Sequence, residues 1–356
     1  MKCFFSLLGL AFTTMFISCN KTSITHAVVP VGPPDTIRLT TDDVPANVYI
    51  CGYNSRSNTN GIVQYWNNGK ITSLTDSSKE FFATSISVSG NDVYIAGQEN
   101  QGENVYARYW KNGAIASLGG TTNFGQATSV FASGGNVYIG VNEANRLPND
   151  SFYILQYWKN GALVTVDTGY GNGAVNSIFV SGNDVYNAGY TGDFHADRFT
   201  AVYWKNNTMI PLTDSTTSAA ANSIFVSGNN VYIAGFIKHG AYSNAEYWKN
   251  GVAVDLSGGS TNEVASSIFV DGNDVYVSGY NYLSPVTIAK YWKNGVPVTL
   301  SDGSFAARTS SIFVSNNDVY VAGSENNAAK YWKNGVGHVI SGNVTEHEAT
   351  SIFVTR

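Results

Sequence analysis

The residues best suited to chemistry in this sequence lie in one short segment, 191–199, which reads TGDFHADRF. The segment gathers carboxylates, an imidazole, a guanidinium and two aromatic rings, on Asp193, Phe194, His195, Asp197, Arg198 and Phe199. Aromatic rings with scattered carboxylates and amides suit the binding of a glycan or a peptide. We therefore expect this segment to contact a glycan or protein ligand. The alternative is a loop that folds onto its own aromatic side chains.

Motifs of known enzyme classes are missing from the sequence. The five histidines, at positions 26, 195, 239, 338 and 347, show no metal-ligand spacing. No GxSxG, HExxH, EF-hand or sialidase Asp-box (SxDxGxTW) pattern is present. We therefore predict a non-enzymatic protein with no cofactor and no metal site.

A glycoside hydrolase or lyase is the alternative function. Such an enzyme needs two carboxylates that flank the scissile bond. The acidic residues available for that role are Asp193, Asp197, Glu263 and Glu346. Nothing in the sequence selects two of them, and carboxylates in solvated loops would explain them equally well.

The word YWKNG, at 291–295, is a second candidate site, because Tyr291 and Trp292 beside Lys293 could stack on a sugar or a base. Versions of it recur at 65–69, 109–113, 157–161, 203–207, 247–251 and 331–335, and they use all seven tryptophans. Positions kept in every copy serve the shared architecture, since one ligand rarely needs seven copies of a site. We therefore predict a structural role for the Tyr-Trp pair, with repeated carbohydrate stacking as the alternative.

The same repetition predicts the fold. Besides YWKNG, the sequence contains seven versions of VYIAG and seven versions of SIFV. Each unit therefore predicts four short strands, rich in Val, Ile, Tyr, Phe and Trp and bounded by Gly, Asn and Asp. Asn294-Gly295 and its counterparts supply the positive φ angles of tight hairpins. Seven such units predict an all-β, seven-bladed β-propeller with four antiparallel strands per blade. A β-solenoid is the alternative, but its parallel coils do not accommodate two tight hairpins per unit.

The two ends of the repeat region complement each other. The first unit lacks SIFV, since residues 40–43 read TTDD, whereas an extra SIFV follows the seventh YWKNG at 351–354. We expect this C-terminal strand to join the first blade, which closes the ring and removes its exposed edges. The propeller is then predicted to span residues 46–356.

The unit YWKNG–VxVxL–variable segment–SIFVSGNDVYVAG resembles the repeat of a family of YWKNG-repeat propeller lipoproteins from Gram-negative bacteria. More loosely, it is similar to the HAF repeat of extracellular bacterial proteins. The resemblance covers residues 46–354. It implies a repeat architecture and carries no assigned chemistry, so it does not indicate a substrate.

Residues 1–18 have the features of a signal peptide. Lys2 precedes an apolar run from Phe4 to Ile17, which is short for a membrane span but suits a signal. The run leads into Cys19 in a pattern that resembles the lipobox of bacterial lipoproteins, where the cysteine is acylated. A plain secretory signal is the alternative. Either interpretation predicts export from the cytoplasm.

Residues 19–45 are predicted to be a lipid-attached flexible tether, because 20–36 holds three prolines and few large side chains. Asn20 is not the aspartate associated with retention in the inner membrane. We therefore expect a cell-envelope protein that is anchored to the outer membrane, facing the periplasm or the surface. The membrane is contacted only through the N-terminal lipid.

Composition excludes several other classes. The net charge is −5, only 13% of residues are charged, and no basic block occurs, which argues against a nucleic-acid partner. Cys51 is the one cysteine in the predicted propeller, so no intrachain disulfide can form there. We expect a monomer that is stabilised by its core alone.

Strand order predicts where a ligand would bind. If the first strand of each unit runs downwards, the short SGND and KNG turns lie on the bottom face and the variable loops on the top. Binding residues tend to lie on variable loops held by a rigid scaffold, so we predict a top-face site. Its further aromatic candidates are Phe81, Phe82, Phe124, Tyr170, Tyr242, Tyr282 and Phe305.

The third and fourth units are the least regular. The third has the longest loop, 142–153, and its glycine is displaced by one position in the sequence Ile139-Gly140-Val141. In the fourth unit, Asn187 replaces the usual isoleucine or valine. We expect irregularities of this kind to mark places where function departs from the shared architecture.

Overall fold

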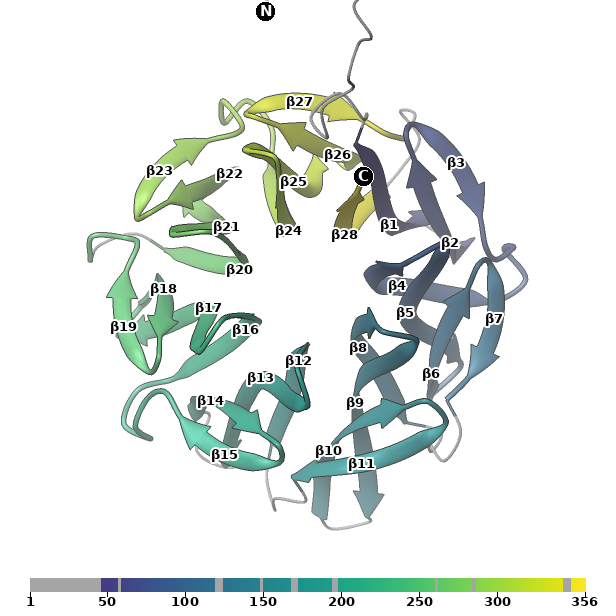
Figure 1. The fold of residues 1–356 in the computed structure, drawn as a ribbon, viewed down its shortest axis with the longest axis horizontal. Coiled ribbons are helices and arrows are strands. Elements are labelled where there is room, and N and C mark those ends of the chain that lie inside the picture. The colour runs from purple at the N-terminus through teal and green to yellow at the C-terminus, as the bar shows by residue number, and fades with distance from the viewer. Residues whose placement is uncertain are drawn as a thin grey trace, which may run out of the picture. The chain divides into compact units, whose positions relative to one another are not determined.

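The computed structural model describes residues 46–56, 59–118, 124–147, 150–167, 172–193, 198–259, 262–283, 286–341 and 347–356. Within these ranges the chain forms 28 strands in seven sheets of four antiparallel strands. The sheets follow one another around a central axis (Figure 1). The predicted seven-bladed propeller is therefore confirmed. The predicted signal peptide and tether lie outside the described residues.

Blade 1 consists of β28 (His347–Thr355), β1 (Asn47–Arg56), β2 (Thr59–Asn67) and β3 (Lys70–Ser73). Blade 2 consists of β4 (Glu80–Ser89), β5 (Asp92–Gln101), β6 (Asn104–Lys111) and β7 (Ala114–Ser117). Blade 3 consists of β8 (Gly125–Ser133), β9 (Asn136–Leu147), β10 (Asp150–Lys159) and β11 (Ala162–Asp167). Blade 4 consists of β12 (Asn172–Ser181), β13 (Asp184–Asp193), β14 (Arg198–Lys205) and β15 (Thr208–Pro211).

Blade 5 consists of β16 (Ala219–Ser227), β17 (Asn230–His239), β18 (Tyr242–Lys249) and β19 (Val252–Asp255). Blade 6 consists of β20 (Glu263–Asp271), β21 (Asp274–Leu283), β22 (Val286–Lys293) and β23 (Val296–Thr299). Blade 7 consists of β24 (Ala307–Ser315), β25 (Asp318–Glu325), β26 (Ala328–Lys333) and β27 (Val336–Val339). In each blade the first strand named lies innermost (Figure 1). Residues of all seven first strands line a central channel.

The ring closes as predicted. The C-terminal strand β28 pairs antiparallel with β1, with Ile50 opposite Ile352 and Asn47 opposite Thr355. Figure 1 shows β28 lying beside β1 at the start of the ring. The first blade therefore takes its innermost strand from the other end of the chain, and hydrogen bonds within one sheet hold the two ends of the propeller together.

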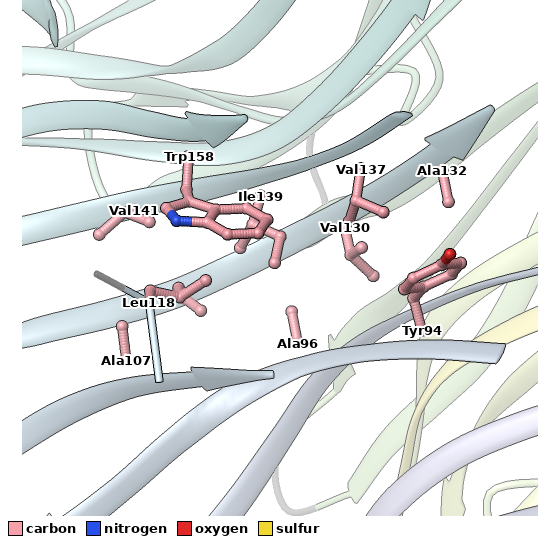
Figure 2. Packing of buried hydrophobic residues seen from close by; sticks show 11 residues of the cluster. Tyr94, Ala96, Ala107, Leu118, Val130, Ala132, Val137, Ile139, Val141 and Trp158 are labelled. Carbon is pink, nitrogen blue, oxygen red and sulfur yellow. The ribbon is translucent and has the colours of Figure 1, made fainter. Parts of the chain in front are cut away.

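The cores of the propeller lie between neighbouring blades. Between blades 2 and 3, Trp158 packs over Leu118, Ile139 and Val141 (Figure 2). The other six tryptophans of the YWKNG words are at most 1% exposed. The predicted structural role of these tryptophans is confirmed, because side chains so deeply buried cannot stack on a sugar.

The remaining residues of YWKNG build the bottom turns. In blade 2, Asn112 and Gly113 have φ angles of 50° and 86°, as a tight hairpin requires. The Asn112 carboxamide accepts a hydrogen bond from the Val93 N–H at 2.8 Å and donates one to Asp92 at 2.7 Å. Lys111 forms an ion pair with Asp92 at 2.8 Å and lies over the ring of Tyr94, 5.3 Å from its centroid. The YWKNG sequence therefore forms the bottom turn, in which Lys111 pairs with Asp92.

Each innermost strand contains a β-bulge that the repeats do not reveal by themselves. In blade 2 the bulge falls between Ala83 and Ser85, so that Thr84 has no partner on β5. The bulge brings the backbone against Gly97, where an added Cβ would lie 2.1 Å from the carbonyl oxygen of Phe82. The glycine of the VYIAG word is therefore required by this close approach.

The displaced glycine of blade 3 compensates for a larger side chain on the neighbouring blade. Gly140 stands where the other blades have alanine, serine or cysteine, and Val141 takes the place of the glycine. A Cβ on Gly140 would lie 3.1 Å from Cγ1 of Val175, which replaces the smaller alanine found at the same position of β8. The smaller residue on one blade makes room for the larger one on the next, so this irregularity has a structural cause.

Candidate functional site

The structure separates the aromatic residues predicted on the top face into three groups. Phe81 is 6% exposed and packs edge-on against Trp110, so the prediction that it faces a ligand is wrong. Phe124 is half-buried and bridges to Val105. Tyr242, Tyr282 and Phe305 are 53%, 41% and 51% exposed and can contact a ligand. The residues that lie outside the described part of the chain are Tyr170, Phe194, His195 and Asp197.

What the structure describes of segment 191–199 supports local packing. Asp193 ends β13 and pairs through its backbone with Arg198, the exposed first residue of β14. The ring of Phe199 stacks edge-on against Tyr190, with centroids 4.9 Å apart. At least this aromatic residue therefore folds onto its own blade, as the alternative interpretation of the segment required.

A different cluster assembles where the channel opens on the top face. The second residues of the innermost strands β24 and β28 are Arg308 and Glu348. They lie at the end of each strand opposite the bottom turn, and neighbouring second strands contribute tyrosines at the same level. We call this group the mouth cluster, and its members are Tyr53, Phe82, Tyr280, Tyr282, Arg308 and Glu348.

Direct contacts link the members of the mouth cluster within and between blades. The Tyr53 hydroxyl donates a hydrogen bond to Glu348 at 2.7 Å, and its ring meets Phe82 edge-on at 4.8 Å. The guanidinium of Arg308 lies 5.5 Å from the centroids of both Tyr280 and Tyr282. The cluster therefore extends over blades 6, 7, 1 and 2.

The electrostatics of Tyr280 connect the two halves of the cluster. Burial and the hydrogen bond with Tyr282 raise the pKa of Tyr280 to about 12. Arg308 acts in the opposite direction, and Glu348 adds to the increase. Both charged groups are thus close enough to act on one phenol, and Tyr280 stays a neutral hydrogen-bonding group at physiological pH.

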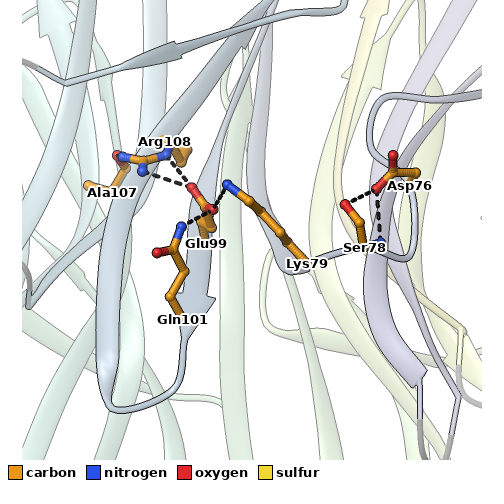
Figure 3. Close-up of polar contacts among 7 residues, drawn as sticks. All are labelled: Asp76, Ser78, Lys79, Glu99, Gln101, Ala107 and Arg108. Atoms are coloured by element: carbon orange, nitrogen blue, oxygen red, sulfur yellow. Dashed lines mark hydrogen bonds and ion pairs between the residues drawn. The ribbon is translucent and has the colours of Figure 1, made fainter.

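Buried carboxylates elsewhere near the top face are structural. Glu99 is 2% exposed and binds Arg108 and Lys79, at 2.8 and 2.7 Å, together with Gln101 (Figure 3). Burial raises the pKa of this carboxyl, but the hydrogen bonds from Lys79, Gln101 and Arg108 outweigh that effect and lower it. These charges pair with one another within blade 2, so the Glu99 carboxylate is already bound.

The proposed glycosidase carboxylates do not form a pair among the described side chains. Glu263 is 3% exposed and is bound by Lys290 and Asn281, so its predicted availability as a catalytic acid is wrong. Asp197 and Glu346 lie outside the described residues, and so does the side chain of Asp193. In the mouth cluster itself, Glu348 is the one carboxylate.

Other chemistries have no support within the described ranges. No group of three or more His, Cys, Asp or Glu side chains there is placed to hold a metal ion. Burial raises the pKa of the Cys51 thiol to about 12, and the sulfur lies 3.4 Å from the Thr350 hydroxyl, so it is a poor nucleophile. Across the same residues, no helix is long and apolar enough to cross a membrane.

Four members of the mouth cluster were not predicted: Tyr53, Tyr280, Arg308 and Glu348. Arg308 and Glu348 lie three residues before the serine of SIFV, where the other blades have Phe82, Gln126, Ala174, Ala220 and Val264. A blade-by-blade comparison of this one position would have shown that it varies. The position lies on a strand, whereas the predicted site was built from variable loops, and Phe82 is the one residue at this position that was predicted.

No protein-family model and no curated protein sequence matches this chain. Among solved structures, acylaminoacyl peptidase from Pyrococcus horikoshii is similar with a TM-score of 0.50 and 10% identity, over 83% of this chain and 52% of that one. An acylaminoacyl peptidase in complex with Z-Gly-Gly-Phe-chloromethyl ketone has a TM-score of 0.51 and 9% identity, over 83% of this chain and 51% of that one. The β-propeller domain of the Trilobed protease from Pyrococcus furiosus has a TM-score of 0.47 and 10% identity, over 72% of this chain and 78% of that one.

These likenesses concern the fold alone. The chain spans about half the length of the two acylaminoacyl peptidases, and at most 10% of the aligned residues are identical. Fold similarity at this level does not transfer an activity, because unrelated functions share the propeller scaffold.

Proposed function

We propose that this protein is a non-enzymatic, lipid-anchored binding protein of the cell envelope whose mouth cluster binds a glycan. The observation that supports it is the grouping of exposed aromatic surface with one cation and one carboxylate at the channel opening. Tyr282 is 41% exposed, and the Arg308 guanidinium lies 5.5 Å from its ring centroid. Such a surface offers stacking for a sugar ring and charged partners for its hydroxyl or acidic groups.

Binding is favoured over hydrolysis by the chemistry of the cluster. A glycoside hydrolase uses two carboxyl groups separated by about 5–10 Å. Glu348 has no second carboxylate beside it within the cluster, and it accepts a hydrogen bond from Tyr53 at 2.7 Å. A carboxylate held in this way is suited to accept hydrogen bonds from sugar hydroxyl groups.

A glycan array tests the site. We expect the wild-type protein to bind a defined set of glycans, and Tyr282→Ala and Arg308→Gln each to weaken that binding by about tenfold or more. Tyr242→Ala is the matched control, because Tyr242 is an exposed top-face tyrosine outside the mouth cluster. Equal binding by all four proteins would remove the mouth cluster from consideration. Release of sugar by the wild type that is lost in Glu348→Gln would replace binding with hydrolysis.

Anchoring is tested separately. If Cys19 is acylated, radiolabelled palmitate is incorporated into the wild-type protein and the label co-sediments with membranes. Cys19→Ala is expected to abolish incorporation, and Cys51→Ala serves as the control because Cys51 is buried. Incorporation that survives Cys19→Ala would contradict the anchor without affecting the proposed binding site.

A further inference from the structure

Arg308 is the cation of the mouth cluster, and its side chain forms no ion pair or hydrogen bond with another described residue. The side chain is exposed, and its guanidinium lies 5.5 Å from the ring centroids of both Tyr280 and Tyr282. These two rings meet edge-on, with centroids 5.2 Å apart. A guanidinium that stacks on aromatic rings keeps the N–H groups at its edge available for a planar acceptor.

Other cations near the top face are neutralised within the protein. Arg108 pairs with Glu99 at 2.8 Å in blade 2. Blade 7 also has a carboxylate, Glu325, but Lys330 of the same blade binds it. Because Glu325 is already bound, the positive charge of Arg308 is not neutralised by the described residues of its own blade.

Glu348 occupies the position of Arg308 on the next innermost strand, β28. It accepts a hydrogen bond from the Tyr53 hydroxyl at 2.7 Å, and it forms no ion pair with Arg308. Both groups nevertheless lie near enough to Tyr280 to change the pKa of its phenol. The mouth cluster therefore presents two separate charges of opposite sign on neighbouring strands.

These two charges suit different parts of one ligand. A guanidinium can donate two parallel hydrogen bonds to a carboxylate. An ionised carboxylate such as Glu348 only accepts hydrogen bonds, so it suits hydroxyl groups and repels a second carboxylate. The ring of Tyr282, which is 41% exposed, offers a surface on which a sugar ring can stack. A sugar that carries a carboxylate is a uronic acid.

We propose that the mouth cluster selects an acidic glycan in which a uronic acid is linked to a neutral sugar. The carboxylate of the uronic acid binds Arg308, hydroxyl groups of the neutral sugar donate hydrogen bonds to Glu348, and one sugar ring stacks on Tyr282. This preference rests on the proposed glycan binding and adds the charge pattern of the ligand. Adjacent uronic acids are disfavoured, because the second carboxylate is repelled by Glu348.

The test is an array of short oligosaccharides that contain glucuronic or galacturonic acid, each printed beside its methyl ester. The ester has nearly the same shape without the charge. We expect the wild-type protein to bind the free acids about tenfold or more tightly than the esters. Arg308→Gln is expected to remove this difference by weakening the binding of the free acids alone. Arg308→Lys keeps the charge without the planar fork and should retain part of the preference.

Glu348→Gln tests the second charge. It is expected to strengthen the binding of oligosaccharides with adjacent uronic acids, while the binding of methyl esters does not increase. Tyr242→Ala is the matched control, because this exposed top-face tyrosine lies outside the mouth cluster, and it should keep the wild-type preference. Thermal unfolding of each variant shows whether it is folded.

The outcomes separate the charge preference from glycan binding itself. Equal binding of free acids and esters by the wild type overturns the preference, and so does a preference that survives in Arg308→Gln. If neutral glycans bind and Tyr282→Ala abolishes that binding, the proposed function stands and the acidic preference alone fails. If the wild-type protein binds no glycan, both fail.

Discussion

Asn187 is a polar residue at an apolar position of the propeller. Its side chain is fully buried, and neither Oδ1 nor Nδ2 has a hydrogen-bond partner. At the equivalent position, Ile139 and Ile233 are 0% and 1% exposed within packed clusters of blades 3 and 5. A buried amide without partners loses its bonds to water and gains none in return, so this residue destabilises the fold.

We expect Asn187→Ile to stabilise the protein. The substitution removes two unsatisfied polar atoms and restores the side chain that blades 3 and 5 carry, so the free energy of unfolding should rise by about 1–3 kcal/mol. Urea denaturation of wild type and variant measures the change. Ile233→Asn is the reverse exchange in blade 5 and should lower the free energy of unfolding. A loss of stability in Asn187→Ile would show that the amide has a partner or role of its own.

Glu246 is a carboxyl side chain at a position where three other blades have a cationic side chain. It precedes the Tyr-Trp pair, where blades 2, 6 and 7 have Arg108, Lys290 and Lys330 in ion pairs. Glu246 is 5% exposed and its Oε2 has no hydrogen-bond partner. Burial, with a smaller contribution from Asp255, raises its pKa to about 7.

This raised pKa predicts a pH-dependent stability. Between the ordinary value of 4.5 and about 7, the folded state holds a proton that the unfolded state has lost. The free energy of unfolding should therefore fall as pH rises through this window, by up to about 3 kcal/mol from this one group. Glu246→Gln cannot ionise, so its unfolding free energy should depend less on pH over the same range.

Chemical denaturation at several values between about pH 5 and pH 8 measures this difference. Glu99→Gln is the control, because the pKa of Glu99 is lowered and its loss should not flatten the curve in that window. Parallel curves for wild type and Glu246→Gln would contradict the raised pKa of Glu246.

In every blade except blade 3, the bulge of the innermost strand requires a glycine at the facing position of the second strand. In blade 5, a Cβ on Gly235 of β17 would lie 2.0 Å from the carbonyl oxygen of Ala220 on β16. The next two atoms, at 3.0 and 3.1 Å, are also backbone atoms, so no side-chain movement can relieve the contact. The glycine and the bulge therefore form one unit.

We expect Gly235→Ala to lower the free energy of unfolding by at least about 2 kcal/mol, because the backbone of β16 must shift. Gly251→Ala is the control. Gly251 has a φ of 82° in the bottom turn but no atom within 4 Å of its added Cβ. Its cost should be only the conformational one of about 1–2 kcal/mol. Thermal and urea unfolding compare the two variants, and a smaller loss for Gly235→Ala would contradict the steric argument.

Turns and strands of this propeller could be predicted more fully than the bulges. The Asn-Gly pairs specify a backbone conformation locally, and the structure gives Asn112 and Gly113 the positive φ angles that this predicts. The bulge at Thr84 depends on pairing between β4 and β5, which the residues of one strand do not specify. For the same reason the sequence identified Tyr282 and Phe82 as site residues but missed Arg308 and Glu348, which the bulged strands place at the channel opening.

For the whole molecule, closure by β28 is the contact on which the ring depends. Removing residues 350–356 would take away the β28 residues that pair with Asn47 to Cys51 of β1, and would leave Phe313 without its neighbour Phe353. An unpaired innermost strand exposes backbone groups that favour aggregation and proteolysis. We expect the truncated protein to unfold at a lower temperature and to be cut faster by protease.

A synthetic peptide of residues 346–356, added to the truncated protein, is the control for a specific effect. It should restore protease resistance by pairing with β1, whereas a scrambled peptide should not. An unchanged melting temperature after truncation would contradict the dependence of the ring on this strand.

The sequence by itself determined the repeat, the strand pattern, the tight turns and the closure of the ring, because these follow from local backbone preferences and from counting units. It also predicted correctly that the Trp of YWKNG is structural. The tertiary structure decided which side chains face one another across the channel. Phe81 turned inward and Glu263 was bound by Lys290, while Tyr53, Arg308 and Glu348 met at the mouth. Glu263 and Lys290 are 27 residues apart and meet when blade 6 folds, whereas Tyr53 and Glu348 are 295 residues apart and meet because the ring closes.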